Sequence, residues 1–152
     1  MTAGFAIVDL FAGPGGLAEG FSSFETEAGI RPFNVALSIE KEKSAHQTLR
    51  FRSFLRQFGK KYPQNYYDWL NLGGAEPDWK ALYPSEWEAA EEEALCLTLG
   101  EEPAGKIIAD RVSAIRKVHG RNTVLIGGPP CQAYSLVGRA RNRGIANYDA
   151  AQ

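Results

Sequence analysis

The sequence predicts an α/β fold in which helices flank a parallel β-sheet. Short apolar runs typical of buried parallel strands occur at Phe5–Phe11, Phe33–Glu40 and Val124–Ile126. A glycine-rich turn follows the first run directly, and stretches with helical spacing lie between the runs. This alternation is typical of a Rossmann-like sheet, in which ligands bind beyond the carboxyl ends of the strands.

Length and composition indicate one ordinary globular domain of 152 residues. The net charge of −1 gives no overall attraction to polyanions, so any contact with nucleic acid must come from local patches. No apolar run reaches the roughly 20 residues that span a bilayer, and a cytoplasmic location is expected. Because Cys96, Cys131, His46 and His119 lack metal-ligand spacing, neither a metal site nor a disulfide framework is predicted.

The first strand should lead into a turn at Ala12–Gly16 and then a helix, in which Leu17, Phe21 and Phe24 recur at helical spacing. Glycines let the backbone approach a ligand closely, and a helix N-terminus favours an anionic group. At this point dinucleotide binding and S-adenosylmethionine binding fit the pattern equally well.

The second strand is expected at Phe33–Glu40 and ends in an acid about 20 to 25 residues after the glycines. A carboxylate there can reach both hydroxyls of a ribose lying across the end of the first strand, although a solvated strand end is the alternative. A second helix is expected from Ser44 to about Phe58, with His46 at its surface or half-buried.

Residues 59–105 look like a mostly helical insertion. Aromatic residues interleave with lysines near its start, and a satellite core is favoured over a nucleic-acid surface. An acidic helix is expected at Trp87–Leu99, with Cys96 in a structural position. Ile107–Asp110 is expected to be a third strand or a strand end, followed by a short helix and a fourth strand at Val124–Ile126.

The fourth strand is followed by Gly127-Gly128-Pro129-Pro130-Cys131, which predicts a stiff turn that presents a thiol. A lone cysteine is more often a small buried hydrophobe, but strand-ending prolines are a poor way to build a core position. Further on, Arg139 and Arg141 fit either a solvated loop or a lid that contacts phosphates.

Three motifs together resemble those of the cytosine-C5 DNA methyltransferases. Asp9–Gly16 (DLFAGPGG) is similar to the first motif of that family, Ser38–Glu40 to its second and Gly128–Gln132 (GPPCQ) to its catalytic motif. The resemblance implies a Rossmann-like methyltransferase fold that binds S-adenosylmethionine, and it decides the cofactor question against a dinucleotide.

By this resemblance, Phe11 stacks on the adenine, Glu40 binds the ribose and Asp110 bonds the adenine amino group. Two departures are Lys41, where many relatives have an aromatic residue, and Arg111, where an apolar residue is common. The expected cofactor-binding residues are Asp9, Phe11, Ala12, Gly13, Gly15, Gly16, Glu40, Asp110 and Pro130.

The implied chemistry makes Cys131 the catalytic nucleophile that adds to C6 of a cytosine flipped out of double-stranded DNA. A loop that closes over the base would supply contacts to the nucleic acid. The expected loop contacts are Gln132, Ser135, Arg139 and Arg141.

The Glu-Asn-Val motif, the later strands and the target-recognition region of that family are not found in the sequence. Residues 1–152 are therefore expected to be the N-terminal part of a catalytic domain, with the catalytic loop beginning at 136–152. A bacterial modification or restriction-modification enzyme is expected, either truncated or completed by a C-terminal chain. The alternatives are a non-catalytic fragment that binds S-adenosylmethionine and a tRNA cytosine-C5 methyltransferase.

Overall fold

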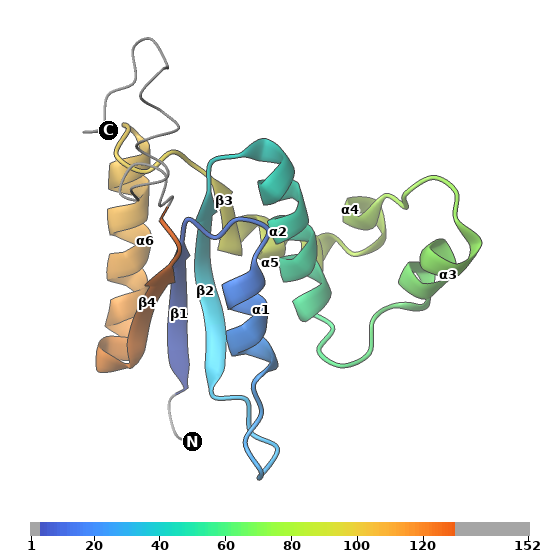
Figure 1. The fold of residues 1–152 in the computed structure, drawn as a ribbon, viewed down its shortest axis with the longest axis horizontal. Coiled ribbons are helices and arrows are strands. Elements are labelled where there is room, and N and C mark those ends of the chain that lie inside the picture. The colour runs from blue at the N-terminus through green and yellow to red at the C-terminus, as the bar shows by residue number, and fades with distance from the viewer. Residues whose placement is uncertain (1–3, 130–152) are drawn as a thin grey trace, which may run out of the picture.

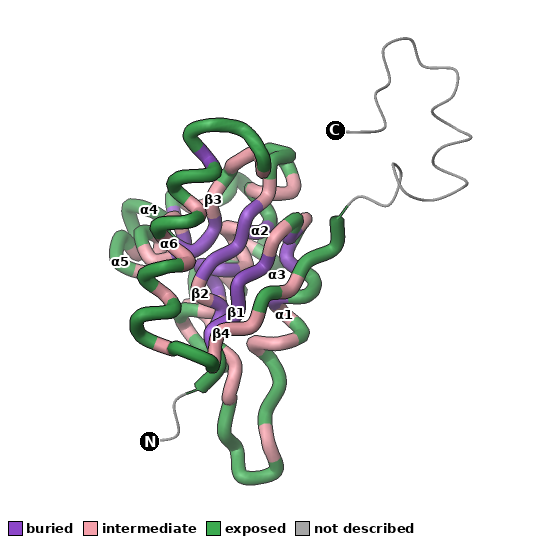
Figure 2. The backbone as a smooth tube through the Cα atoms, turned by 90° about the vertical axis from the view of Figure 1, so that its left-hand side faces the viewer, coloured by how far each residue is buried: buried purple, intermediate pink, exposed green. Residues whose placement is uncertain are grey.

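The computed structural model describes residues 4–129 and shows a four-stranded parallel sheet with helices on both faces (Figure 1). The strands lie in the order β3-β2-β1-β4, and α6 covers the face opposite to α1 and α2 (Figure 2). The predicted α/β class is therefore confirmed. The strands are β1 (Phe5–Leu10), β2 (Phe33–Glu40), β3 (Ala94–Cys96) and β4 (Thr123–Gly127), and the helices are α1 (Gly16–Ser23), α2 (Lys43–Arg56), α3 (Gln64–Leu72), α4 (Trp79–Leu82), α5 (Pro84–Glu93) and α6 (Ala104–His119).

The first βαβ unit forms as predicted. The centre of β1 is fully buried, which explains its continuous apolar run, and β2 has the predicted bounds. Leu10 pairs in register with Ile39 of β2 and with Gly127 of β4. Three strands therefore end at one level, and the turns that follow them share one edge of the sheet.

The predicted strand over Ile107–Asp110 is wrong, because these residues lie in α6. Ile108, Val112 and Ile115 are spaced as one helical stripe, and this stripe packs on Val8 and Leu37 of the sheet. A four-residue apolar run does not distinguish a strand from the buried side of a helix. Here the helical spacing, which continues beyond the run to Val112 and Ile115, indicates the helix.

The third strand is instead β3, which lies within the segment Trp87–Leu99 that was predicted to be a helix. Helix α5 ends at Glu93, and the chain then pairs with β2, Ser38 opposite Ala94 and Glu40 opposite Cys96. Pairing with an already buried strand outweighs the helical preference of this short segment. Residues 59–105 thus contain a sheet strand as well as α3, α4 and α5.

An aromatic core lies under α3, α4 and α5, away from the sheet, as the aromatic run predicts. Phe54 of α2 is fully buried at its centre and packs against Trp79, at 5.7 Å between ring centroids. The other members include Phe51, Phe58, Tyr62, Tyr66, Trp69, Tyr83 and Trp87. Within residues 4–129, no helix is both long enough and apolar enough to cross a membrane.

Candidate functional site

The carboxyl ends of the strands bring the glycine turn, Glu40 and the start of the segment after β4 to one edge of the sheet. The glycine turn leaves β1 here, Glu40 ends β2, and Cys96 ends β3 directly beside Glu40 in the register. Gly127 ends β4 opposite Leu10. The two motifs that lie far apart in the sequence, the glycine turn and the segment after β4, therefore leave the sheet side by side.

The glycine turn has a backbone that only glycine adopts readily. Gly13 has a φ of 56° and Gly15 a φ of 93°, and the N–H of Ala12 donates to the Ile39 carbonyl at 2.9 Å. Within residues 4–129, Phe11 is the only non-glycine residue with a positive φ, 59°. Such a backbone costs on the order of 1–3 kcal/mol for a bulky residue, and it leaves the Phe11 ring exposed at this edge.

Glu40 holds the glycine turn through one carboxylate oxygen and the residue that caps α2 through the other. The N–H of Gly13 donates to Oε2 at 2.8 Å, and the N–H of Glu42 donates to Oε1 at 2.8 Å. An ionised carboxylate has about four acceptor positions, so each oxygen keeps one for a further donor. Glu40 can therefore hold the turn and still accept two hydroxyl groups of a ligand.

Gly16 begins α1, and within residues 4–129 it has no neighbour within 4 Å of the position where a Cβ would stand. We expect Gly16→Ala to leave the free energy of unfolding unchanged or to raise it by up to about 1 kcal/mol, because alanine is the better helix former. If the cofactor occupies this space, the same variant should bind S-adenosylmethionine at least about tenfold more weakly by calorimetry. Unchanged affinity would remove Gly16 from the cofactor site.

Asp9 lies beneath the turn rather than at its surface. Its side chain is fully buried, and neither carboxylate oxygen has a hydrogen bond of normal geometry to another described residue. Burial raises the pKa of Asp9, while the Ala18 amide in the first turn of α1 and the charge of Arg56 lower it in part. This position favours support of α1, and direct contact of Asp9 with a cofactor stays a prediction.

Asp110 does not stand at a strand end. It is exposed in α6, and Cys96 occupies the carboxyl end of the third strand instead. The exposed Cys96 thiol lies 3.7 Å from the Lys41 carbonyl oxygen. Sequence reasoning missed this neighbour of Glu40, although the apolar segment Ala94–Leu97 was a usable signal for a strand. A contact of Asp110 with adenine stays a prediction.

The structure describes the segment after β4 only as far as Pro129. Gly127 is packed so closely that an added Cβ would lie closer than 3.0 Å to the Leu10 carbonyl oxygen, a separation that real Cβ atoms do not show. Gly128, by contrast, has nothing within 4 Å of its Cβ position in the part of the chain that the structure describes. The predicted site residues Pro130, Cys131, Gln132, Ser135, Arg139 and Arg141 lie outside the described residues.

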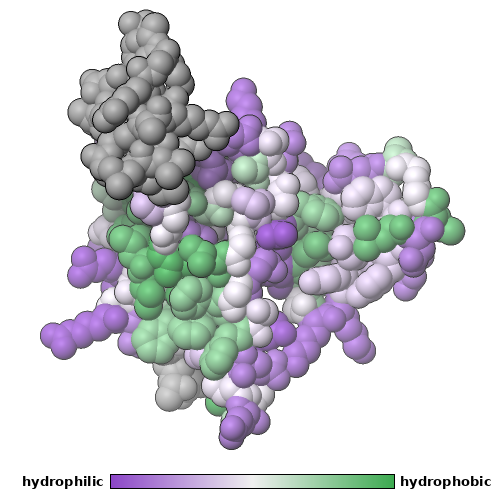
Figure 3. Space-filling model, viewed as in Figure 1, coloured by the Kyte–Doolittle hydropathy of each residue, from purple (hydrophilic) through white to green (hydrophobic). Residues whose placement is uncertain are grey.

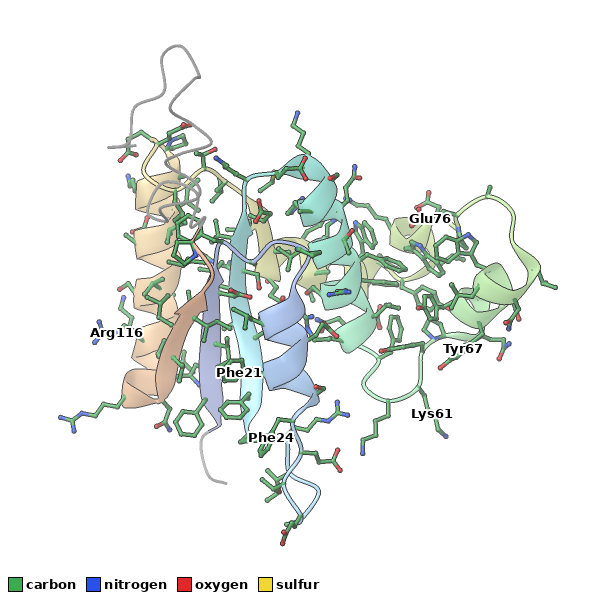
Figure 4. The ribbon with its side chains drawn as sticks, in the orientation of Figure 1. Phe21, Phe24, Lys61, Tyr67, Glu76 and Arg116 are labelled. Atoms are coloured by element: carbon green, nitrogen blue, oxygen red, sulfur yellow. The ribbon has the colours of Figure 1, made fainter. Side chains whose placement is uncertain are left out.

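A cavity of about 400 Å³ lies away from this edge, among α1, α2 and the start of β2. Arg56 lines it and joins two carboxylates, Glu93 at 2.5 Å and Glu19. The Glu93 side chain is only 9% exposed, and this burial raises its pKa against the opposing effects of Arg56 and Ser53. The three charges tie α1, α2 and α5 together (Figure 4 shows the ribbon with its side chains).

The raised pKa of Glu93 makes its contribution to stability depend on pH. The folded protein keeps this proton above the ordinary pKa of 4.5, so the contribution is complete below that value and is lost as pH rises through the folded pKa. We expect the free energy of unfolding of Glu93→Gln to fall less than that of wild type as the pH rises from the ordinary value of 4.5 to about 8. Urea melts across this range measure the difference.

Glu25 provides the matched control for this titration. Lys60 and then Arg31 lower its pKa, so its contribution is present above the ordinary value of 4.5 and is lost as pH falls. Glu25→Gln should therefore gain less stability than wild type as pH rises. Identical pH slopes for the Glu93 and Glu25 variants would contradict the assignment.

The fold and the carboxyl-edge site together define an α/β protein with a Rossmann-like sheet of the methyltransferase kind. No protein-family model matches the chain, and no solved structure matches it significantly.

Among curated proteins, the chain is similar to the type II methyltransferase M.Bpa9945I of Bacillus paralicheniformis. The two are 31% identical over 160 residues, which cover 95% of this chain and 34% of the relative. The putative type II methyltransferase M.OihORF3336P of Oceanobacillus iheyensis is 27% identical over 139 residues, covering 91% of this chain and 21% of that relative. The chain is a distant homologue of type II methyltransferases and spans about a third and about a fifth of these two relatives.

Proposed function

We propose that this chain is the cofactor-binding part of a DNA cytosine-C5 methyltransferase that uses S-adenosylmethionine, in a bacterial modification or restriction-modification system. The observation that carries the proposal is the pairing of Leu10 with Gly127, which starts the glycine turn and the Pro-Pro-Cys segment at the same edge. The bacterial relatives named type II methyltransferases support it.

The edge has features that fit S-adenosylmethionine. Each oxygen of Glu40 keeps an acceptor position for a ribose hydroxyl, and the exposed Phe11 ring offers a face for the adenine. The open space at Gly16 and the start of α1 suit the carboxylate of the methionine part. When bound, this cofactor supplies an electrophilic methyl group.

Cys131 would make the target carbon nucleophilic. Its thiolate forms a bond from Sγ to C6 of cytosine, and the electron pair of the C5–C6 double bond moves so that C5 becomes nucleophilic. After C5 has taken the methyl group, loss of the C5 proton to a base and expulsion of the Cys131 thiolate restore the double bond. The Pro129-Pro130 pair ahead of the cysteine would limit its backbone freedom.

The cytosine must leave the helix before Cys131 can reach C6, which costs a few kcal/mol of stacking and pairing. Gln132 and Ser135 would contact the flipped base, and Arg139 and Arg141 the phosphates, which suits a chain whose net charge is only −1. These contacts make the segment after Cys131 the principal local patch for nucleic acid.

The proposal is tested by covalent trapping. A duplex with 5-fluorocytosine at the target position, together with S-adenosylmethionine, should give a stable adduct with the protein that carries this chain, because fluorine at C5 cannot leave as a proton does. Cys131→Ser should give none, while Cys96→Ser should give as much as wild type on denaturing gels. A wild-type protein that traps no such duplex would overturn the proposal.

A divided enzyme is the second candidate, since this chain spans only about a third of the first relative. In that case the chain alone would bind the cofactor weakly and form the adduct only after a complementing C-terminal chain is added. A tRNA substrate is less favoured because both relatives are named type II methyltransferases. Competition between labelled DNA and tRNA for the adduct separates the two substrates.

A further inference from the structure

One arginine of α2 packs on the glycine turn. Helices α1 and α2 lie on the same face of the sheet, and the turn leads from β1 into α1 (Figure 1). A Cβ on Gly15 would lie 2.9 Å from Cδ1 of Leu49 and 3.8 Å from Cδ of Arg52. Leu49 is fully buried beneath the turn, whereas Arg52 is half-buried beside it. The guanidinium of Arg52 begins one bond beyond Cδ, so its charge stands close to the turn.

Arg52 has no counter-charge in the part of the chain that the structure describes. Within residues 4–129, its guanidinium makes no hydrogen bond or ion pair with another side chain. No acid stands three or four positions from Arg52 in α2, and the acid of α1, Glu19, pairs with Arg56 instead. A charge that is partly removed from water is costly unless an opposite charge compensates it.

The other two arginines of α2 are bound to protein groups. Arg50 lies 4.8 Å from the centre of the Trp87 ring and 3.6 Å from Glu91, and Arg56 pairs with two carboxylates. On the face of the molecule in Figure 3, hydrophilic side chains lie over α1 and α2, beside the hydrophobic area over the strands. Arg52 is thus the arginine of α2 that remains available for an anion, and it is the one beside the glycine turn.

We propose that Arg52 binds the carboxylate of the methionine part of S-adenosylmethionine. This inference rests on the proposed function, in which the glycine turn holds that part of the cofactor. A guanidinium can bind a carboxylate through two parallel N–H···O bonds, and such charged hydrogen bonds are stronger than neutral ones. An adenosine compound without the carboxylate would lose this contact. Arg52 would therefore make the site selective for the complete cofactor.

The test compares two ligands that differ in this carboxylate. Calorimetry measures the Kd of S-adenosylmethionine and of decarboxylated S-adenosylmethionine for the protein that carries this chain. Wild type should bind the decarboxylated ligand at least about tenfold more weakly, because a charged hydrogen bond is lost. Arg52→Met should bind both ligands with equal affinity, so that its loss falls on S-adenosylmethionine.

Arg116→Met is the matched control. It removes an arginine from the last turn of α6, which precedes the amino end of β4 and is remote from the carboxyl edge (Figure 4). This variant should keep the wild-type preference for S-adenosylmethionine. Arg52→Lys should keep part of it, because lysine retains the charge but not the paired N–H groups. Arg52→Met should melt in urea at the same midpoint as wild type, since it breaks no ion pair.

An Arg52→Met protein that keeps the tenfold preference would overturn the inference. Equal loss of affinity for both ligands would also overturn it, because Arg52 would then only support the turn. A loss of affinity for DNA alone would assign Arg52 to a phosphate and have the same consequence. Wild type that binds neither ligand would contradict the proposed function itself, whereas normal trapping of 5-fluorocytosine DNA with unchanged selectivity in Arg52→Met would contradict only the role of Arg52.

Discussion

Gly127→Ala is expected to destabilise the fold and to slow adduct formation, although it adds only one methyl group. That methyl group would stand closer than 3.0 Å to the carbonyl oxygen of Leu10, which is backbone and cannot rotate away. Strands β1 and β4 must separate locally, and overpacking of this kind costs about 1–3 kcal/mol, occasionally more. Urea melts monitored by circular dichroism should show this loss.

The effect on chemistry should be larger than the effect on stability. Gly127 is the last residue of β4, and Cys131 follows four residues later, so a shift of β4 against β1 moves the nucleophile relative to the glycine turn. A misplacement of 1 Å can cost about 10²-fold in rate. The rate of adduct formation with 5-fluorocytosine DNA should therefore fall by about that factor even under conditions where the variant is folded.

Gly128→Ala is the matched control, because no atom of the described residues lies within 4 Å of its Cβ position and its φ is not positive. This variant should melt like wild type and keep its rate of adduct formation within a few-fold. A Gly127→Ala protein with the stability and rate of wild type, or a Gly128→Ala protein with equal losses, would contradict the proposed link between β4 and the site.

The elements that sequence reasoning located correctly are those whose local signals agree. β1, β2 and β4 each combine a run of β-branched or aromatic residues with a turn signal. The sheet buries the centres of β1 and β2 as expected, whereas β4 lies at the edge of the described sheet and its Leu125 is 66% exposed, so the expected burial of β4 is not seen within residues 4–129. The predictions for the segments that form β3 and α6 were wrong because their local signals are ambiguous. Their apolar segments are short and fit both the period of a strand and that of a helix. Pairing with β2 makes one of them a strand, and packing on the sheet makes the other a helix. Neither contact can be read from the local sequence.

The hydrogen bonds and ion pairs around the candidate site could not be predicted from the sequence. The glycines and Glu40 could be selected by spacing, whereas the hydrogen bond from Gly13 to Glu40 joins residues 27 positions apart and depends on the register of β1 and β2. The ion pairs of Arg56 with Glu19 and Glu93 each join residues 37 positions apart. Such pairs follow from the packing of three helices, which no single-sequence pattern contains.

Arg56→Met should produce the largest loss of stability among the charged residues of the described part of the chain. The Arg56 side chain is 15% exposed and that of Glu93 is 9% exposed, so the variant leaves a buried carboxylate without its cation. Removing one partner of a buried pair costs about 3–5 kcal/mol. The contact with Glu19 adds little, because the Glu19 side chain is 38% exposed and solvent screens it.

Two features of the structure determine how large the loss of stability in Arg56→Met should be. Arg56 and Glu93 line the cavity of about 400 Å³, so water can reach the orphaned carboxylate and bring the loss towards the lower end, about 3 kcal/mol. The raised pKa of Glu93 also lets the variant take up a proton, so the deficit should shrink as pH falls towards 5. Urea melts at pH 5 and pH 8 measure both effects.

Arg31→Met makes the same chemical change in an exposed pair with Glu25, separated by 3.4 Å, and should cost much less stability than Arg56→Met because solvent screens the pair. The double variant Arg56→Met/Glu93→Gln should recover much of the stability lost in Arg56→Met, because no buried charge is then left without a partner. If Arg56→Met is no less stable than Arg31→Met, or if the second substitution restores nothing, the charges around Arg56 do not hold α1, α2 and α5 together as the geometry indicates.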